Sequence, residues 1–214
     1  MAWTAEIDQA NLTLSGQRVL DGVDLRLAAG RIPVLVGPGG GGKTLLLKVL
    51  ATLLRPDSGE VRLFGTPVDH DDPDALRTVR SRIGVQFQNL ALFDFLSVAE
   101  NVAFPLVQDR HPPAPEEVAT RVKDALAAVH LPSAGTLPVQ ALSGGMQRRV
   151  AVARAAVARP DLLLFDDPSG GLDPVTTSRI FALIADHQAR TGCTVVVASH
   201  DIDRLARIAA EFHV

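Results

Sequence analysis

Apolar and polar positions alternate with two different periods along this chain of 214 residues. A period of two, typical of half-buried strands, covers 7–14 and 23–27, with a turn at 15–17 between them. Further strands are predicted at 34–36, 59–64, 83–87, 162–165 and 194–198. Helical periodicity or helix-start signals predict helices over 43–54, up to Arg80, and over 115–130, 143–159, 175–190 and 202–210. Strands that alternate with helices favour an α/β fold with a mainly parallel sheet covered on both faces, beside an N-terminal antiparallel β portion.

The pattern changes after Asn89, where closely spaced prolines interrupt the helical periodicity. Within 115–130 one helix face is apolar, which suits a helix that packs through that face. The first turn carries two glutamates, which suit the positive end of the helix dipole. Together with the Ala/Arg-rich helix at 143–159, this stretch predicts a small helical lobe. We expect the lobe to span approximately 89–158 and to be inserted into an α/β core formed by 1–88 and 159–214.

Composition narrows the possible functions. An apolar share of 47% supports a sizeable core, whereas a formal charge of −3 and a pI near 6.0 argue against a nucleic-acid partner. Cys193 is the only cysteine, so an internal disulfide is impossible and a reducing compartment fits. The N-terminal residues do not resemble a signal peptide, and no apolar run is long enough to cross a bilayer. We therefore expect any membrane role to depend on a partner.

A glycine-rich loop provides the clearest chemical signal. It follows the apolar run 34–36 and leads directly into a leucine-rich helix, and its residues are Gly37, Pro38, Gly39, Gly40, Gly41, Gly42, Lys43 and Thr44. Glycines allow consecutive backbone N–H groups to turn toward an anion, and the helix start adds its positive dipole end. Lys43 would contact the β- and γ-phosphates, and the Thr44 hydroxyl would ligate Mg²⁺. This strand–loop–helix arrangement predicts a nucleoside triphosphate site.

Two other segments complete the predicted chemistry. Asp166 and Asp167 follow four apolar residues, so they lie at the carboxyl end of a buried strand, where Asp166 would hold Mg²⁺ beside the phosphate loop. Ser143, Gly144 and Gly145 open another helix, and a serine hydroxyl with glycine-flanked N–H groups forms a second place for an anion. One chain rarely needs two such places for a single nucleotide.

With these motifs in this order, the chain resembles the nucleotide-binding subunits of ATP-binding-cassette (ABC) transporters over nearly its whole length. The matching segments are Gly37 to Thr44 (Walker A), Gln88 (Q-loop), Leu142 to Gln147 (signature motif), Leu162 to Asp167 (Walker B), Gly171 to Asp173 (D-loop) and His200 (switch histidine). The resemblance implies a head-to-tail dimer in which ATP lies between the phosphate loop of one subunit and the signature motif of the other. The second subunit would be either another copy of this chain or a paired ABC subunit.

The resemblance also implies roles for individual residues. Lys43, Gln88, Asp167 and His200 would be catalytic, and Thr44, Gln88 and Asp166 would hold Mg²⁺ directly or through water. Ser143, Gly144 and Gly145 would contact the ATP held by the other subunit. An integral membrane permease would be the partner, which would place the subunit on the cytoplasmic face of the inner membrane.

A narrower likeness concerns the cargo. Segments 91–94, 98–106, 144–149 and 173–177 look like those of the ATPases of bacterial Mce/Mla-type lipid transporters, although another importer class is an open alternative. Some of these segments would flank the permease. Phe93 or Phe95 would then be either a permease contact or part of the core.

The chain departs from the family pattern in three places. Asp167 stands where the family usually has glutamate, which withdraws the carboxylate by about 1.5 Å and predicts slow hydrolysis. Segment 14–18 lacks an aromatic residue for adenine, which predicts weaker ATP binding and poor discrimination against GTP, with Arg18 as a possible platform. The closing strands expected after His200 are absent from the pattern. A degenerate module with little hydrolysis, or a soluble ABC ATPase of DNA repair or translation, are the alternative interpretations.

Overall fold

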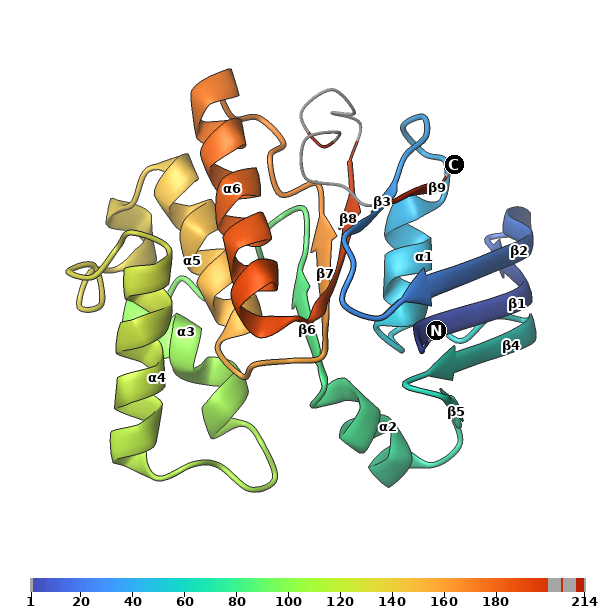
Figure 1. Cartoon of the computed structure of the whole chain (residues 1–214), viewed down its shortest axis with the longest axis horizontal. Coiled ribbons are helices and arrows are strands. Elements are labelled where there is room, and N and C mark those ends of the chain that lie inside the picture. Colours follow the sequence, from blue (N-terminus) through green and yellow to red (C-terminus); the bar gives the residue numbers. More distant parts are fainter. Residues whose placement is uncertain (1, 200–204, 206–210, 214) are drawn as a thin grey trace.

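Two β-sheets form the framework of the protein, for which a computed structural model describes residues 2–199, 205 and 211–213 (Figure 1). The antiparallel sheet has the order β2-β1-β4-β5 and the parallel sheet the order β6-β7-β8-β3-β9. The strands of the first sheet are β1 (Trp3–Leu14), β2 (Gln17–Ala28), β4 (Ser58–Leu63) and β5 (Thr66–Pro67). Those of the second are β3 (Pro33–Leu35), β6 (Ile83–Gln86), β7 (Leu162–Asp166), β8 (Thr194–Ala198) and β9 (Glu211–His213).

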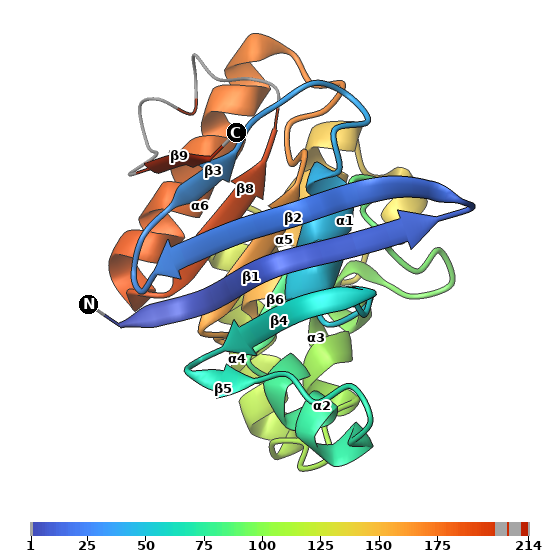
Figure 2. The ribbon, with the colours of Figure 1, turned by 90° about the vertical axis from the view of Figure 1, so that its right-hand side faces the viewer.

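The helices cover both faces of the parallel sheet. They are α1 (Lys43–Leu50), α2 (Pro73–Arg80), α3 (Val98–Val107), α4 (Pro115–Ala128), α5 (Gly144–Ala156) and α6 (Pro174–Thr191), with a short 3₁₀ turn at Val139–Ala141. Helix α1 lies between the two sheets, whereas α3, α4, α5 and α6 gather on the opposite side of the parallel sheet (Figures 1 and 2). No helix in the part of the chain that the structure describes is long and apolar enough to cross a membrane.

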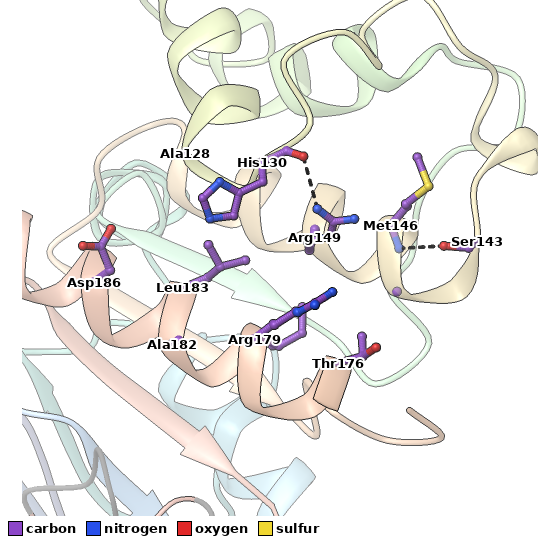
Figure 3. Close-up of a pocket in the computed structure, with 12 residues that line it drawn as sticks. Ala128, His130, Ser143, Met146, Arg149, Thr176, Arg179, Ala182, Leu183 and Asp186 are labelled. Atoms are coloured by element: carbon purple, nitrogen blue, oxygen red, sulfur yellow. Dashed lines mark hydrogen bonds between the residues drawn. The ribbon is translucent and has the colours of Figure 1, made fainter. Parts of the chain in front are cut away.

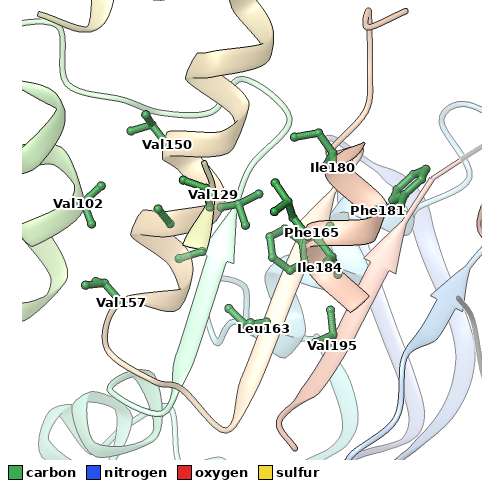
Figure 4. Packing of buried hydrophobic residues seen from close by; sticks show 14 of the residues in the cluster. Val102, Val129, Val150, Val157, Leu163, Phe165, Ile180, Phe181, Ile184 and Val195 are labelled. Atoms are coloured by element: carbon green, nitrogen blue, oxygen red, sulfur yellow. The ribbon is translucent and has the colours of Figure 1, made fainter. Parts of the chain in front are cut away.

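Burial on both faces explains why the sequence of strand β7 is a continuous apolar run. Leu162 and Leu164 belong to the apolar cluster shared with α1 and the antiparallel sheet, while Leu163 and Phe165 belong to the cluster under the helices. Successive side chains of a strand point to opposite faces, so a strand covered on both faces is apolar at every position. Figure 4 shows Leu163 and Phe165 against Ile180 and Ile184 of α6. The predicted α/β class with a mainly parallel sheet is confirmed.

Two details differ from the predictions. Helix α1 ends at Leu50 rather than Leu54, because Thr52 takes a left-handed φ of 58° and Arg80 donates to both its hydroxyl and its carbonyl at 2.8 Å. Strand β9, which the sequence did not predict, pairs in parallel with β3. Most of the predicted helix at 202–210 lies outside the described residues.

Candidate functional site

The glycine loop connects β3 to α1 and turns its backbone toward the helix start. Gly40 and Gly42 have φ values of 78° and 83°, in the left-handed region that glycine adopts without strain. No atom of the described residues lies within 4 Å of the position that a Cβ would take at Gly40, so the loop is open on this side. Gly42 begins α1 without a side-chain cap from the described residues, and the first turn carries no acid. The helix-start N–H groups therefore suit an anion.

Lys43 lies against this loop. Its Nζ donates to the carbonyls of Gly37 and Pro38, both at 2.8 Å, so the ammonium group is held within the turn of the glycine backbone. An ammonium group beside helix-start N–H groups is the donor set that a chain of phosphates requires. The residues present therefore fit a triphosphate.

Thr44 and Asp166 meet from distant parts of the chain. The Thr44 hydroxyl donates to Oδ1 of Asp166 at 3.0 Å, across the gap between α1 and the end of β7. Asp166 is 6% exposed, and burial raises the pKa of its carboxyl group, an effect that the Thr44 hydrogen bond partly opposes and the neighbouring Asp167 reinforces. A hydroxyl and a carboxylate in contact are hard oxygen ligands of the kind that Mg²⁺ accepts together with water and phosphate. The pair fits this ion.

Gln88 lies beside Thr44 and Asp166. It is exposed just after β6 and lines an open hollow of about 620 Å³ together with Thr44 and Asp166. The structure thus brings three of the predicted magnesium and nucleotide residues together, from α1, β7 and the segment after β6.

Asp167 differs from its neighbour in backbone conformation. Its φ of 44° is left-handed, its N–H donates to the carbonyl of Ala198 at 2.8 Å, and its own carbonyl accepts from Gly170 at 3.2 Å. A Cβ on Gly170 would lie 2.5 Å from Oδ2 of Asp167, so the carboxylate packs against the bare Cα of that glycine. Residues 167–170 form a tight turn that carries the carboxylate.

The signature segment forms a second helix start on the other side of the parallel sheet. Ser143 caps α5, since its Oγ accepts from the N–H of Met146 at 3.3 Å, and Gly144 has no described atom within 4 Å of a Cβ position. Ser143 and Gly145 line one end of a hollow of about 710 Å³ between α5 and α6, where Arg149 and Arg179 face each other (Figure 3). Because α1 and α5 pack on opposite faces of the sheet, one chain does not bring the phosphate loop and the signature segment together.

Sequence reasoning missed several residues that organise the site. Arg154 is buried and donates to the carbonyls of Leu90 and Ala91 at 2.6 Å, just after Gln88. Asn101 is fully buried in α3 and bonds both backbone groups of Phe93. An asparagine within the apolar face of a helix was the one available signal. His200 lies outside the described residues.

Comparison with known proteins gives the family. The ABC transporter family model matches residues 20–170. The chain is 38% identical over 204 residues to the intermembrane phospholipid transport system ATP-binding protein MlaF of Escherichia coli K12, covering 95% of this chain and 76% of MlaF. It is 40% identical over 191 residues to the methionine import ATP-binding protein MetN of Brucella abortus, covering 89% of this chain and 51% of MetN.

Solved structures agree. The dimeric, post-hydrolysis structure of the ATP-binding cassette MJ0796 bound to ADP and Pi superimposes with a TM-score of 0.88 at 31% identity, covering 97% of this chain and 92% of that one. The resemblance stated from the sequence is confirmed at the level of fold and family. The chain belongs to the ATP-binding-cassette transporter family, as an ATPase subunit.

Proposed function

We propose that this subunit hydrolyses Mg·ATP as one half of a dimer and thereby drives a membrane permease that moves phospholipids. The observation that carries the proposal is the 3.0 Å contact between Thr44 and Asp166 beside the glycine loop. Two residues far apart in the sequence thereby form the hydroxyl and carboxylate pair that a magnesium-bound triphosphate needs.

Each residue of the site has a defined task in this proposal. Residues 37–42 direct backbone N–H groups at the phosphates, and Lys43 places its ammonium group on the β- and γ-phosphates. Thr44, Asp166 and Gln88 would hold Mg²⁺, which would neutralise charge on the phosphate oxygens when bound. Asp167 would accept a hydrogen bond from the attacking water, and His200, which lies outside the described residues, would contact the γ-phosphate.

The second subunit supplies the rest of the site. Ser143, Gly144 and Gly145 of one subunit face the γ-phosphate bound by the other, and the dimeric relative with ADP and Pi supports this pairing. Sedimentation of Asp167→Asn in Mg·ATP tests it, because blocked hydrolysis should trap the dimer. Lys43→Ala in the same background is the control and should stay monomeric. A monomer in both variants would overturn the proposal.

A shortened carboxylate at position 167 favours slow hydrolysis. A displacement on the order of 1 Å costs about 10²-fold in rate, so the subunit would turn over slowly while still binding ATP. The same observation favours the second candidate function, a module that gates the permease by ATP binding and scarcely hydrolyses. Phosphate release with and without the co-purified permease separates the two, since only the first function predicts release that the permease stimulates.

The adenine end of the site also departs from the family pattern. Segment 14–18 has no aromatic side chain, and the guanidinium of Arg18 is exposed and paired with Asp21 at 2.9 Å. Aromatic stacking on a base is worth roughly 1–3 kcal/mol, so ATP should bind weakly and GTP should compete well. A strong preference for ATP in a competition titration would contradict this.

Phospholipid is the cargo that the comparisons favour. The likeness to MlaF covers more of both chains than the likeness to MetN, and segments 91–94 and 98–106 resemble lipid-transport ATPases. Phe95, 83% exposed in the lobe formed by 89–158, would contact the permease at the inner membrane. The test is to reconstitute the complex that co-purifies with the subunit and to measure ATP-dependent transfer of fluorescent phospholipid. If methionine rather than phospholipid stimulated ATP hydrolysis by the complex, the choice of cargo would be overturned.

A further inference from the structure

Arg148 connects the signature helix to the turn that carries Asp167. It is the sixth position of the run that begins at Ser143, and its half-buried side chain reaches across from α5 to the end of β7. Its Nη2 donates to the carbonyl of Gly170, and its Nη1 donates to the carbonyl of Asp167 at 3.4 Å. The guanidinium therefore joins the first and last residues of the 167–170 turn.

The turn depends on a conformation that ordinary residues avoid. Asp167 has a φ of 44°, and its carbonyl accepts from both Arg148 and the N–H of Gly170. Because the carboxylate packs against the Cα of Gly170, the direction in which Asp167 points follows from how tightly the turn is closed. A planar guanidinium that bridges two carbonyls controls this closure better than a single ammonium group.

We propose that Arg148 is a positioning residue that couples the two ATP sites of the dimer. In the dimer of the proposed function, on which this inference rests, the start of α5 faces the ATP of the other subunit. ATP bound at that site acts on α5. Arg148 transmits the resulting change in α5 to Asp167 of the same chain, and this Asp167 acts on the ATP that its own subunit binds. Each subunit thus hydrolyses efficiently only when its signature segment is engaged.

Arg149 provides a matched control. It is the next residue of α5, it is half-buried, and burial lowers the pKa of its guanidinium as it does for Arg148. Its Nη1 donates to the carbonyls of Val129 and His130, at 3.1 and 3.2 Å, at the end of α4 (Figure 3). Arg149 therefore supports the end of α4, and its hydrogen bonds to the described residues do not reach the turn of Asp167.

The experiment compares Arg148→Gln with Arg149→Gln in the full chain. Turnover is measured against ATP concentration, and deuterium exchange is measured for the amides of 167–170 without nucleotide. Arg148→Gln should lower kcat about 10- to 100-fold, leave KM within about twofold, and reduce the Hill coefficient to about 1. It should also accelerate exchange of the Gly170 amide, and Arg148→Lys should restore part of the rate.

Arg149→Gln should lower thermal stability but keep the wild-type kcat, Hill coefficient and exchange rate of the turn. The inference is overturned if Arg148→Gln retains the wild-type Hill coefficient and exchange rate, or if the two variants lose activity equally. Absence of ATP hydrolysis by the wild type would instead contradict the proposed function, and the exchange measurement would still decide whether Arg148 holds the turn.

Discussion

Asp166 and Asp167 are neighbours in the chain, yet the fold gives their carboxylates different surroundings. Asp166 ends β7 inside the molecule and accepts from the Thr44 hydroxyl, while Asp167 leaves the strand in a left-handed conformation and packs against Gly170. The first position suits an ion held beside the phosphates, and the second suits a group directed at water. The adjacent residues Asp166 and Asp167 therefore suit two different tasks.

Asp166→Asn should stabilise the nucleotide-free protein at neutral pH. Burial raises the folded-state pKa of Asp166, so the stabilisation associated with its protonated form is present below about pH 3.8 and is lost as the pH rises through the folded pKa. The asparagine Oδ1 can still accept from Thr44, and the variant avoids the cost of a buried charge. The gain in Tm over wild type, measured by calorimetry, should be largest at pH 7 and shrink toward pH 4.

Magnesium-dependent ATP binding by the same variant should be lost, because an amide replaces an anionic ligand. A variant that is less stable than wild type at pH 7, or that keeps its affinity for Mg·ATP, would contradict this assignment of Asp166.

Asp167→Glu should raise turnover, by up to about 10²-fold, because the longer side chain restores the reach toward the attacking water. Steady-state phosphate release measures this, with Asp167→Asn as the inactive control. An unchanged or lower rate in Asp167→Glu would mean that the turn at 167–170 already compensates for the shorter side chain.

At the scale of elements, one glycine sets how closely the signature helix approaches the sheet. A Cβ on Gly84 in β6 would lie 2.0 Å from the carbonyl oxygen of Ala155 in α5, so only glycine allows this contact. Helix α5 therefore lies directly on the strand that precedes Gln88. The position of the signature segment depends on this packing.

Gly84→Ala should destabilise the protein by more than about 4 kcal/mol, or prevent folding, because the added Cβ would overlap a backbone carbonyl of α5 that cannot move independently of its helix. Gly135→Ala is the matched control, since a Cβ there would meet only side-chain carbons at 3.5 and 3.6 Å. Urea unfolding compares the two. Similar stability of both variants would contradict the close packing of α5 on β6.

The elements that the sequence predicted are those whose signals are local. The apolar run of β7, the proline and glutamates at the start of α4 and the serine cap of α5 each lie within a few residues of the element they define. The phosphate loop and Asp166 were predictable for the same reason, together with the rule that parallel strands end at one edge.

Features that depend on distant contacts were not predictable. The early end of α1 is set by Arg80, and β9 exists through its pairing with β3. Arg148 and Arg154 donate to carbonyls in segments that are distant from them in the sequence. An arginine in a helix gives no sign of which backbone oxygen it will reach.

For the whole molecule, the helices of the predicted lobe and the parallel sheet share one apolar cluster. It includes Leu126 of α4. It also includes Val102 of α3 and the core residues Leu163, Phe165 and Ile184, which Figure 4 shows. The predicted lobe is thus continuous with the core in packing. We expect the two parts to unfold together.

Leu126→Ala should lower the free energy of unfolding by about 2–5 kcal/mol, because a buried leucine is replaced by a cavity. Chemical denaturation followed by both circular dichroism and tryptophan fluorescence should still give a single transition with coincident midpoints. Two separate transitions would show that the lobe is an independent folding unit.

The order of the strands has a consequence during synthesis. Strand β3, which leads into the phosphate loop, pairs with β8 and β9, and these begin only at Thr194 and Glu211. A nascent chain therefore carries its glycine loop long before the flanking strands have left the ribosome. Nucleotide capture becomes possible only after β8 and β9 have been synthesised, so truncated polypeptides that stop before β8 should be unable to retain ATP.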